Sequence, residues 1–327
     1  MKNLGEATVV DERFKLLAEV ASLYYEDGLT QEEIARKLGI SRSNVSRLLA
    51  EAKQKGIVEI RINYPWETLP SLQMELMNRF NLRVARVLKA DGMGYKRVLR
   101  GLGALAARYL ESILNNVRIL AIGWGTALYE VVNSLRPRQL EIEIVQMIGA
   151  IGSGDPLIDG PELARELAKT LGGRYRYLHA PLIVRDEEVQ RAFLREQRIS
   201  ETLELAKRAD IALVGIGSVD PSVSSLLRAG YIDEGELEAL RQCGAVGDIC
   251  ARQFDIWGNV LDIELNRRVV GIDIESLKRI DCVMGVAGGM PKAPAILGAL
   301  RGGFINVLIT DNEVAQEVLR LDKETKR

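Results

Sequence analysis

The chain has 327 residues, enough for two domains, and 47% of them are hydrophobic. It contains a single histidine, His179, and three scattered cysteines, which excludes a zinc site built from several His or Cys ligands and argues against a disulfide framework. Lysine and arginine (44) balance aspartate and glutamate (45), so the chain is not a polycation that coats nucleic acid along its whole length.

Three helices are predicted in the first sixty residues. Apolar residues at a spacing of three and four predict a helix over residues 13–27. A capping box at Thr30 opens a second helix over residues 31–38, and a third helix follows over residues 41–55. Gly39 lies in the short turn between the second and third helices, and apolar side chains face inward on both sides of it. This pattern indicates a helix-turn-helix.

The third helix carries the candidate DNA contacts. Its exposed positions are polar or basic, and we expect DNA contact from Ser41, Arg42, Ser43, Asn44, Arg47 and Lys53. Arginine and asparagine make bidentate contacts to guanine and adenine edges, and a serine at a helix N-terminus suits a phosphate. A polar face that is merely solvated is the alternative, but the helix-turn-helix context favours DNA contact. Residues 57–62 predict an appended strand, or β-wing, in which Arg61 contacts backbone phosphates or is simply an exposed charge.

The domain boundary is predicted just after this strand. Tyr64-Pro65-Trp66 and then Pro70 interrupt the pattern before a short helix that ends near Asn81. We therefore expect a DNA-binding domain over residues 1–62, a linker with a short helix over 63–81, and a large domain over 82–327.

The large domain alternates short apolar runs with helical segments, which predicts an α/β fold with a doubly wound, mostly parallel sheet. The expected helices include residues 96–114, 127–135, 161–171, 200–208 and 293–301, and Thr310-Asp311 is expected to cap the last helix. The expected strands cover residues 84–88, 118–122, 142–147, 175–178, 211–215, 245–250, 268–271, 283–287 and 307–309. Ligands of such sheets bind at the carboxyl ends of the strands, so the candidate site lies in the loops that follow them.

The first candidate loop is Gly123-Trp124-Gly125-Thr126, between a strand and a helix. Two glycines let backbone amides approach an anion, the helix N-terminus adds positive potential, and the Thr126 hydroxyl donates a further hydrogen bond. An ordinary tight turn explains the glycines equally well. The loop is neither a Walker A loop nor a dinucleotide fingerprint, so ATP and NAD are disfavoured and no cofactor is expected.

Two further loops supply charged side chains. Lys292 follows Gly288-Gly289, where a lysine suits a bound phosphate better than it suits the helix dipole. Gly247-Asp248 comes after the apolar pair Ala245-Val246. A carboxylate there, at a strand end, can accept paired sugar hydroxyls, or it forms a local turn. We therefore expect a ligand site that includes Gly123, Gly125, Thr126, Asp248 and Lys292.

The motifs together resemble the SorC family of bacterial sugar-responsive transcriptional regulators. The resemblance rests on SRSNVSRLLAEAKQKGIVEI, GWGTALYEVV, VGIGSVDPS, GAVGDICARQFDIWGNVLD and VAGGMPKAPAILGALRGGFINVLITDNEVA, and it covers nearly the whole chain. It implies a winged helix-turn-helix followed by an effector domain similar to the ribose-phosphate isomerase and glucosamine-phosphate deaminase folds. It also implies a phosphorylated sugar or polyol as effector and assembly as a tetramer. By position, the resemblance implies that Gly123, Gly125 and Thr126 hold the phosphate of the effector, that Asp248 meets its hydroxyls, and that Gly289 with Lys292 completes the anion site.

Two functions are therefore compared. The first is a regulator that binds operator DNA as a homo-oligomer under the control of a sugar phosphate. The second is a sugar-phosphate isomerase or deaminase with an added DNA-binding segment, for which no carboxylate or histidine is a clear general base. The absence of a long apolar run or a secretory signal pattern predicts a cytoplasmic chain without membrane association. The regulator is favoured, with double-stranded DNA and the effector as its partners.

Overall fold

The computed structural model describes residues 5–58, 64–152 and 158–325, with the side chains of residues 5–11 left aside. The chain divides into two compact units, which we call unit 1 (up to Pro65) and unit 2 (from Trp66). Each unit has its own hydrophobic core and is described by itself.

Unit 1 contains the predicted helix-turn-helix. Its helices are α1 (Gly5–Tyr25), α2 (Gln31–Leu38) and α3 (Arg42–Gln54). The capping box at Thr30 is present, and Gly39 ends α2 in the left-handed conformation, at a φ of 66° that favours glycine. The apolar residues expected to face inward form the core: Leu17, Val20, Ile34, Val45 and Leu48 are fully buried.

Three details of unit 1 differ from the prediction or fall outside it. α1 begins at Gly5, eight residues earlier than expected. Phe14 was expected on the buried face, but its side chain is 52% exposed because Leu17, Val20 and Ala21 occupy the contact with α2 and α3. Most of the predicted β-wing, with Arg61, lies outside the described residues.

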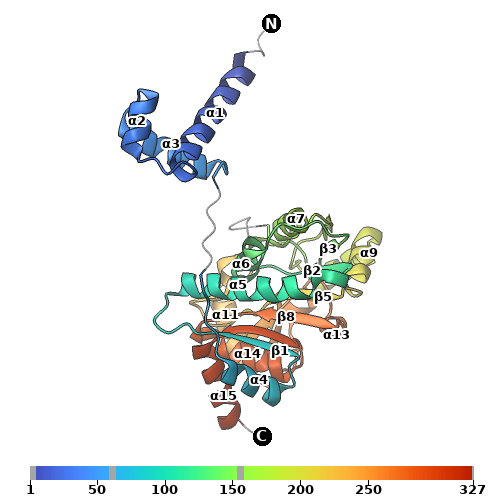
Figure 1. Ribbon diagram of the computed structural model, residues 1–327. Coiled ribbons are helices and arrows are strands. Elements are labelled where there is room, and N and C mark those ends of the chain that lie inside the picture. Colours follow the sequence, from blue (N-terminus) through green and yellow to red (C-terminus); the bar gives the residue numbers. More distant parts are fainter. Residues whose placement is uncertain (1–4, 59–63, 153–157, 326–327) are drawn as a thin grey trace. The chain divides into compact units, whose positions relative to one another are not determined.

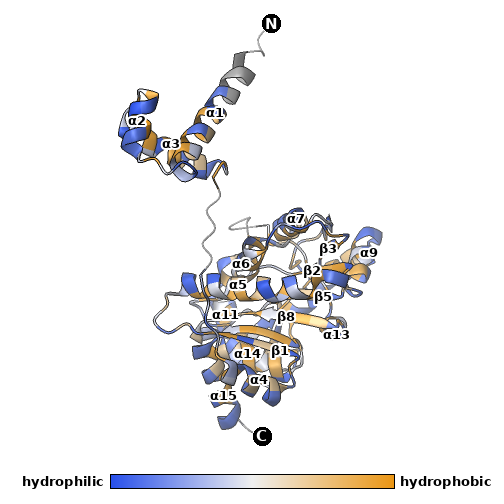
Figure 2. Cartoon of the chain, in the orientation of Figure 1, coloured by the Kyte–Doolittle hydropathy of each residue, from blue (hydrophilic) through white to orange (hydrophobic). Residues whose placement is uncertain are grey.

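Unit 2 is built on a seven-stranded parallel sheet in the order β1-β9-β8-β5-β2-β3-β4. At its centre β5 pairs with β8, with Ile211 opposite Cys282. The central strands are buried on both faces, so their sequences read as continuous apolar runs (Figure 2). The strands are β1 (Val84–Leu88), β2 (Ile119–Ile122), β3 (Glu143–Gln146), β4 (Arg174–Arg176), β5 (Ile211–Gly215), β8 (Cys282–Val286) and β9 (Val307–Asp311).

Helices cover both faces of this sheet, so the predicted doubly wound architecture is confirmed (Figure 1). One face packs against α5 (Tyr95–Ile113), α6 (Thr126–Ser134) and α7 (Gly160–Leu171). The other packs against α4 (Pro70–Phe80), α11 (Glu234–Gln242), α13 (Ile274–Lys278), α14 (Ala293–Arg301) and α15 (Asn312–Glu324). The remaining short helices are η1 (Leu114–Asn116), α8 (Glu187–Arg195), α9 (Gln197–Ala206), α10 (Ser225–Arg228), α12 (Glu264–Arg267) and η3 (Met290–Lys292).

Two predicted strands of the parallel sheet are wrong. The segment 245–250 forms β6 (Ala245–Ile249), which pairs antiparallel with β7 (Arg252–Asp255) in a separate hairpin. The segment 268–271 makes only isolated bridges, such as Val269 with Ile183. Both segments are apolar because they pack on the core, and apolar periodicity alone does not say which partner a strand pairs with.

The predicted linker is largely part of unit 2. Thr68 bridges to Leu88 at the edge of the sheet, and Leu76 of α4 is fully buried. A Cβ atom on Gly101 of α5 would lie 3.1 Å from the Trp66 ring, so this ring packs closely on α5. Within the described residues, no helix has both the length and the apolar character needed to cross a membrane.

Candidate functional site

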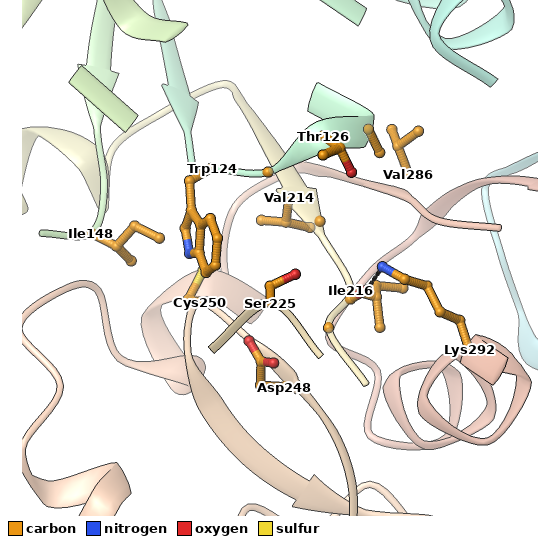
Figure 3. A pocket seen from close by; sticks show the side chains of 15 residues that line it. Trp124, Thr126, Ile148, Val214, Ile216, Ser225, Asp248, Cys250, Val286 and Lys292 are labelled. Atoms are coloured by element: carbon orange, nitrogen blue, oxygen red, sulfur yellow. Dashed lines mark hydrogen bonds between the residues drawn. The ribbon is translucent and has the colours of Figure 1, made fainter. Parts of the chain in front are cut away.

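A pocket lies at the carboxyl ends of β2, β5 and β8, where a parallel sheet is expected to bind its ligand (Figure 3). It brings together five of the six predicted effector residues: Gly123, Gly125, Thr126, Asp248 and Lys292. The sixth, Gly289, is not among the lining residues. In Figure 3 Thr126, Asp248 and Lys292 approach the space from three different elements.

The glycines of the first loop do not offer the amides that the sequence suggested. The Gly123 N–H donates to the Leu213 carbonyl at 3.0 Å, and the Gly125 N–H donates to the Ile158 carbonyl at 3.0 Å. Gly125 has a φ of 123°, a conformation that favours glycine, so its role is to turn the chain into α6.

The N–H groups that are available to an anion belong to the next two residues of the chain, at the start of α6. Among the residues that the structure describes, no side chain caps the N-terminus of α6. The N–H groups of Thr126 and Ala127 have no hydrogen-bond partner among the described residues, and both residues line the pocket. Together with the Thr126 hydroxyl and the helix dipole, these amides form the most favourable anion-binding position in the pocket.

Lys292 supplies the cationic side chain. It lies at the end of η3, directly before α14, and its Nζ donates to the Ile216 carbonyl at 2.6 Å (Figure 3). Burial lowers the pKa of Lys292 to about 8, against the attraction of Asp248, and the positive charge of Arg228 lowers it further. The ammonium is therefore held with few compensating charges, and a ligand anion would restore its usual stability.

Asp248 faces the same pocket from a different element than expected. It lies within β6 of the separate hairpin, not at the end of a parallel strand, and it is only 8% exposed. Burial raises the pKa of Asp248 to about 6, although Lys292 and the Ala251 backbone N–H both oppose the shift. A Cβ atom on Gly217 would lie 1.9 Å from the carboxylate, so the glycine two residues after β5 is what lets Asp248 approach.

Gly289 has a structural task instead. Its N–H donates to the Asp311 carboxylate at 2.8 Å, so it is not available to an anion in the pocket. Its φ of 91° shapes the turn that places Lys292.

The pocket also contains residues that the sequence did not suggest. Trp124, Ser225 and Cys250 line it, and Arg228 is close enough to influence Lys292. Ser225 and Arg228 lie on α10, a single helical turn too short to give a periodic signal. Cys250 precedes Ala251, and both residues have a positive φ in the tight turn between β6 and β7. Such turns usually contain Asn-Gly, so Cys250-Ala251 does not predict a hairpin.

In unit 1 the predicted DNA-contacting residues cluster around the N-terminal half of α3. Ser41, Arg42, Ser43 and Arg47 are exposed, and Asn44 is half-buried. The Arg47 guanidinium donates to the Asn44 side chain at 2.9 Å, so these two residues form one polar surface. The Ser41 hydroxyl accepts from the Asn44 N–H as the helix cap. Lys53 lies on the last turn of α3, with its ammonium 5.7 Å from the centre of the Tyr25 ring.

Family models match both units. Residues 64–320 match the family of sugar-binding domains, and residues 20–63 match the MarR family. The chain is 34% identical over 309 residues to the deoxyribonucleoside regulator of Bacillus subtilis, covering 94% of this chain and 98% of that protein. It is 36% identical over 312 residues to the transcriptional regulator LsrR of an Enterobacter species, covering 94% and 93%.

Solved structures of transcriptional regulators are also similar to this chain. The full-length sorbitol operon regulator SorC of Klebsiella pneumoniae superimposes with a TM-score of 0.73 at 31% identity, over 93% of this chain and 98% of that one. A DeoR family transcriptional regulator of Listeria monocytogenes superimposes with a TM-score of 0.70 at 30% identity, over 76% and 98%. The relatives are named as transcriptional regulators, which supports the regulator and not the isomerase or deaminase.

Proposed function

The chain belongs to the SorC family of sugar-responsive transcriptional regulators, and from this premise we propose that a phosphorylated sugar or polyol in the pocket of unit 2 controls operator binding by α3. That the chain is a DNA-binding regulator with a sugar-binding domain follows from its relatives. We propose in addition that the effector is phosphorylated, which residues contact the effector and the DNA, and that the chain forms an oligomer.

The phosphate is proposed because the N–H groups of Thr126 and Ala127, at the N-terminus of α6, have no hydrogen-bond partner in the described part of the chain. The amides of Thr126 and Ala127, the Thr126 hydroxyl and the Lys292 ammonium line one space. Amide donors at a helix N-terminus and a nearby lysine are a common phosphate-binding arrangement. With an uncharged sugar, only the attraction of Asp248 would offset the burial of the Lys292 charge, so the pocket favours the phosphorylated form.

Asp248 is proposed to hold the sugar. Its buried carboxylate accepts two hydroxyl hydrogen bonds when ionised, which suits neighbouring hydroxyls of a sugar or polyol. Two relatives are named for a deoxyribonucleoside and for sorbitol, which supports ligands of this class for the present chain.

On the DNA side, Arg42, Asn44 and Arg47 would contact base edges, while Ser41, Ser43 and Lys53 would contact the phosphate backbone. A single short helix gives modest affinity, so we propose a homo-oligomer, a tetramer as in the family, that places several copies of α3 on one operator. Such a regulator acts in the cytoplasm, where its operator is found.

The test compares sugars with their own phosphates. Thermal unfolding of the full chain is measured with ribose, 2-deoxyribose and sorbitol, and with ribose 5-phosphate, 2-deoxyribose 5-phosphate and sorbitol 6-phosphate. At least one phosphate should raise the Tm where its parent sugar does not, because a ligand at 100 times its Kd adds about 2.7 kcal/mol to stability.

The variants Thr126→Val and Lys292→Met should lose this shift. Lys278→Met, which removes a lysine of α13 outside the pocket, should keep it. A parent sugar that stabilises as strongly as its phosphate, or an undiminished shift in Lys292→Met, would contradict the proposed site.

A further inference from the structure

Two consecutive buried polar residues join β9 to α15. Asp311 is 2% exposed and Asn312 is 5% exposed. Asp311 caps α15 by accepting from the Val314 N–H at 3.0 Å, and its other oxygen accepts from the Gly289 N–H at 2.8 Å. A Cβ atom on Gly288 would lie 2.5 Å from the same carboxylate. The loop that leads to Lys292 is therefore fixed to the start of α15.

Asn312 fixes a second loop to the same point. Its side-chain carbonyl accepts from the Ala90 N–H at 2.7 Å, and its amide donates to the Asp91 carboxylate at 2.7 Å. Ala90 and Asp91 follow β1. Asp311 and Asn312 thus hold two separate loops at adjacent backbone positions.

The second loop continues into the segment through which the chain enters unit 2. The Lys89 N–H donates to the Glu67 carbonyl at 2.9 Å, and the Lys89 ammonium contacts the Glu67 carboxylate at 2.9 Å. The Leu69 N–H donates to the Val87 carbonyl at 3.0 Å. Residues 67–69, which we call the entry segment, are thereby tied to the loop that Asn312 holds.

Burial makes this arrangement stiff. A buried donor or acceptor that loses its partner costs about 1–3 kcal/mol, so a shift of one loop favours a matching shift of the other over a broken hydrogen bond. Hydrogen bonds join Gly289 to Asp311, Asn312 to Ala90 and Asp91, and Lys89 to Glu67, and peptide bonds join these pairs to one another. The buried part of this path is at Asp311 and Asn312, whereas Lys89 and Glu67 are exposed.

We propose that Asp311 and Asn312 are positioning residues that couple the state of the Lys292 loop to the entry segment. The inference rests on the proposed function for its input, because ligand binding at Lys292 is what would move the loop. Neither residue contacts the ligand in this account. Their task is to carry its effect to the segment that follows unit 1 in the chain.

The experiment perturbs the pocket without a ligand, so it does not depend on which sugar binds. Hydrogen exchange is measured by mass spectrometry on the full chain and on Lys292→Met, which loses the hydrogen bond to Ile216. Exchange should accelerate at least threefold at the Gly289 amide, and by a similar factor at the amides of Leu69 and Lys89.

The Lys292→Met substitution is then made in two variants, each of which lacks one asparagine side chain. In Asn312→Ala, Lys292→Met should still accelerate exchange at Gly289 but should have no further effect at Leu69 and Lys89. In Asn306→Ala, the effect should reach the entry segment as before. Asn306 is a suitable control because its side chain also makes two hydrogen bonds, accepting from the Val283 N–H and donating to the Asp281 carbonyl, but at the opposite end of β9.

Either of two results would overturn the coupling: no effect of Lys292→Met at the entry segment of the unmodified chain, or an undiminished effect in Asn312→Ala. If Asn312→Ala does not fold, Asp91→Ala takes its place, because Asp91 is exposed and accepts the Asn312 amide. Reduced transmission in Asp91→Ala supports the coupling, and unchanged transmission contradicts it. Failure of every sugar phosphate to bind would contradict the proposed function and leave this result standing.

Discussion

Lys292 and Asp248 are the two buried ionisable side chains of the proposed effector site, and burial changes the pKa of each. Burial lowers the pKa of Lys292 to about 8 and raises the pKa of Asp248 to about 6. Each shift opposes the charged form, and the mutual attraction of the two groups only partly offsets it. A phosphorylated sugar would relieve both, because its phosphate stabilises the ammonium and its hydroxyls hydrogen-bond the carboxylate.

The Asp248 shift predicts a pH dependence of stability. The pKa of Asp248 is raised from 3.8 to about 6 in the folded chain. Between these values the folded state holds a proton that the unfolded state has lost, so this contribution to the unfolding free energy falls as pH rises. It is complete below about pH 4 and lost above about pH 6, and it amounts to on the order of 3 kcal/mol at 1.36 kcal/mol per pH unit.

The contribution of Asp248 to the unfolding free energy is measured by chemical denaturation of the unmodified chain and of Asp248→Asn from pH 4 to pH 7. The stability of the unmodified chain relative to the variant should decline across the interval. Lys292 does not obscure the comparison, because its pKa of about 8 keeps it protonated between pH 4 and pH 7 in the folded state as well as in the unfolded state. A difference that is flat with pH would show that Asp248 is not buried as described.

At this scale the sequence predicted most of the pocket but not how each residue works. Five of the six predicted effector residues line it, and Gly289 does not. The amides of Gly123, Gly125 and Gly289 are all bonded to groups distant in sequence, namely Leu213, Ile158 and Asp311. A glycine motif says where the backbone can bend, but the partners of its N–H groups depend on the fold.

At the scale of elements, the sequence predicted where α2 begins and ends, but it did not predict which strand β6 pairs with. α2 begins at the Thr30 capping box and ends at Gly39, as predicted, because a helix cap involves only residues that are close together in the chain. The direction and partner of β6 could not be predicted, because the Cys250-Ala251 turn lacks the usual residues of a hairpin. Asp248 was therefore expected at a strand end and lies inside a strand.

α3 gives a prediction at this scale. Arg47→Ala should weaken binding to a specific operator by about 1–3 kcal/mol if Arg47 contacts a base, with little change for scrambled DNA of equal length. Arg36→Ala, which removes a basic residue from the last turn of α2, is the matched control. Any loss of affinity in Arg36→Ala should be equal for both DNAs, because a positive charge that does not contact a base attracts DNA regardless of its sequence.

Fluorescence anisotropy at fixed salt measures both affinities. Equal losses for specific and scrambled DNA in Arg47→Ala would assign Arg47 to the phosphate backbone. An unchanged affinity would remove it from the DNA-contacting residues.

The whole molecule combines a DNA-binding unit with a ligand-binding unit. Neither unit explains regulation alone, because a ligand shifts an equilibrium only when it binds two states with different affinity. The near-zero net charge fits this division: DNA affinity would depend on where basic residues lie on α3 and on the number of copies per operator, not on total charge.

The most direct test of ligand control is DNA affinity with and without ligand. A duplex selected by the protein from random sequences is titrated alone, with a saturating phosphorylated sugar that raises the Tm, and with its parent sugar. The Kd for DNA should change at least tenfold, about 1.4 kcal/mol, with the phosphate only. Lys292→Met should bind the duplex equally well and show no response. A Kd that the bound phosphate leaves unchanged, or a full response in Lys292→Met, would contradict the account.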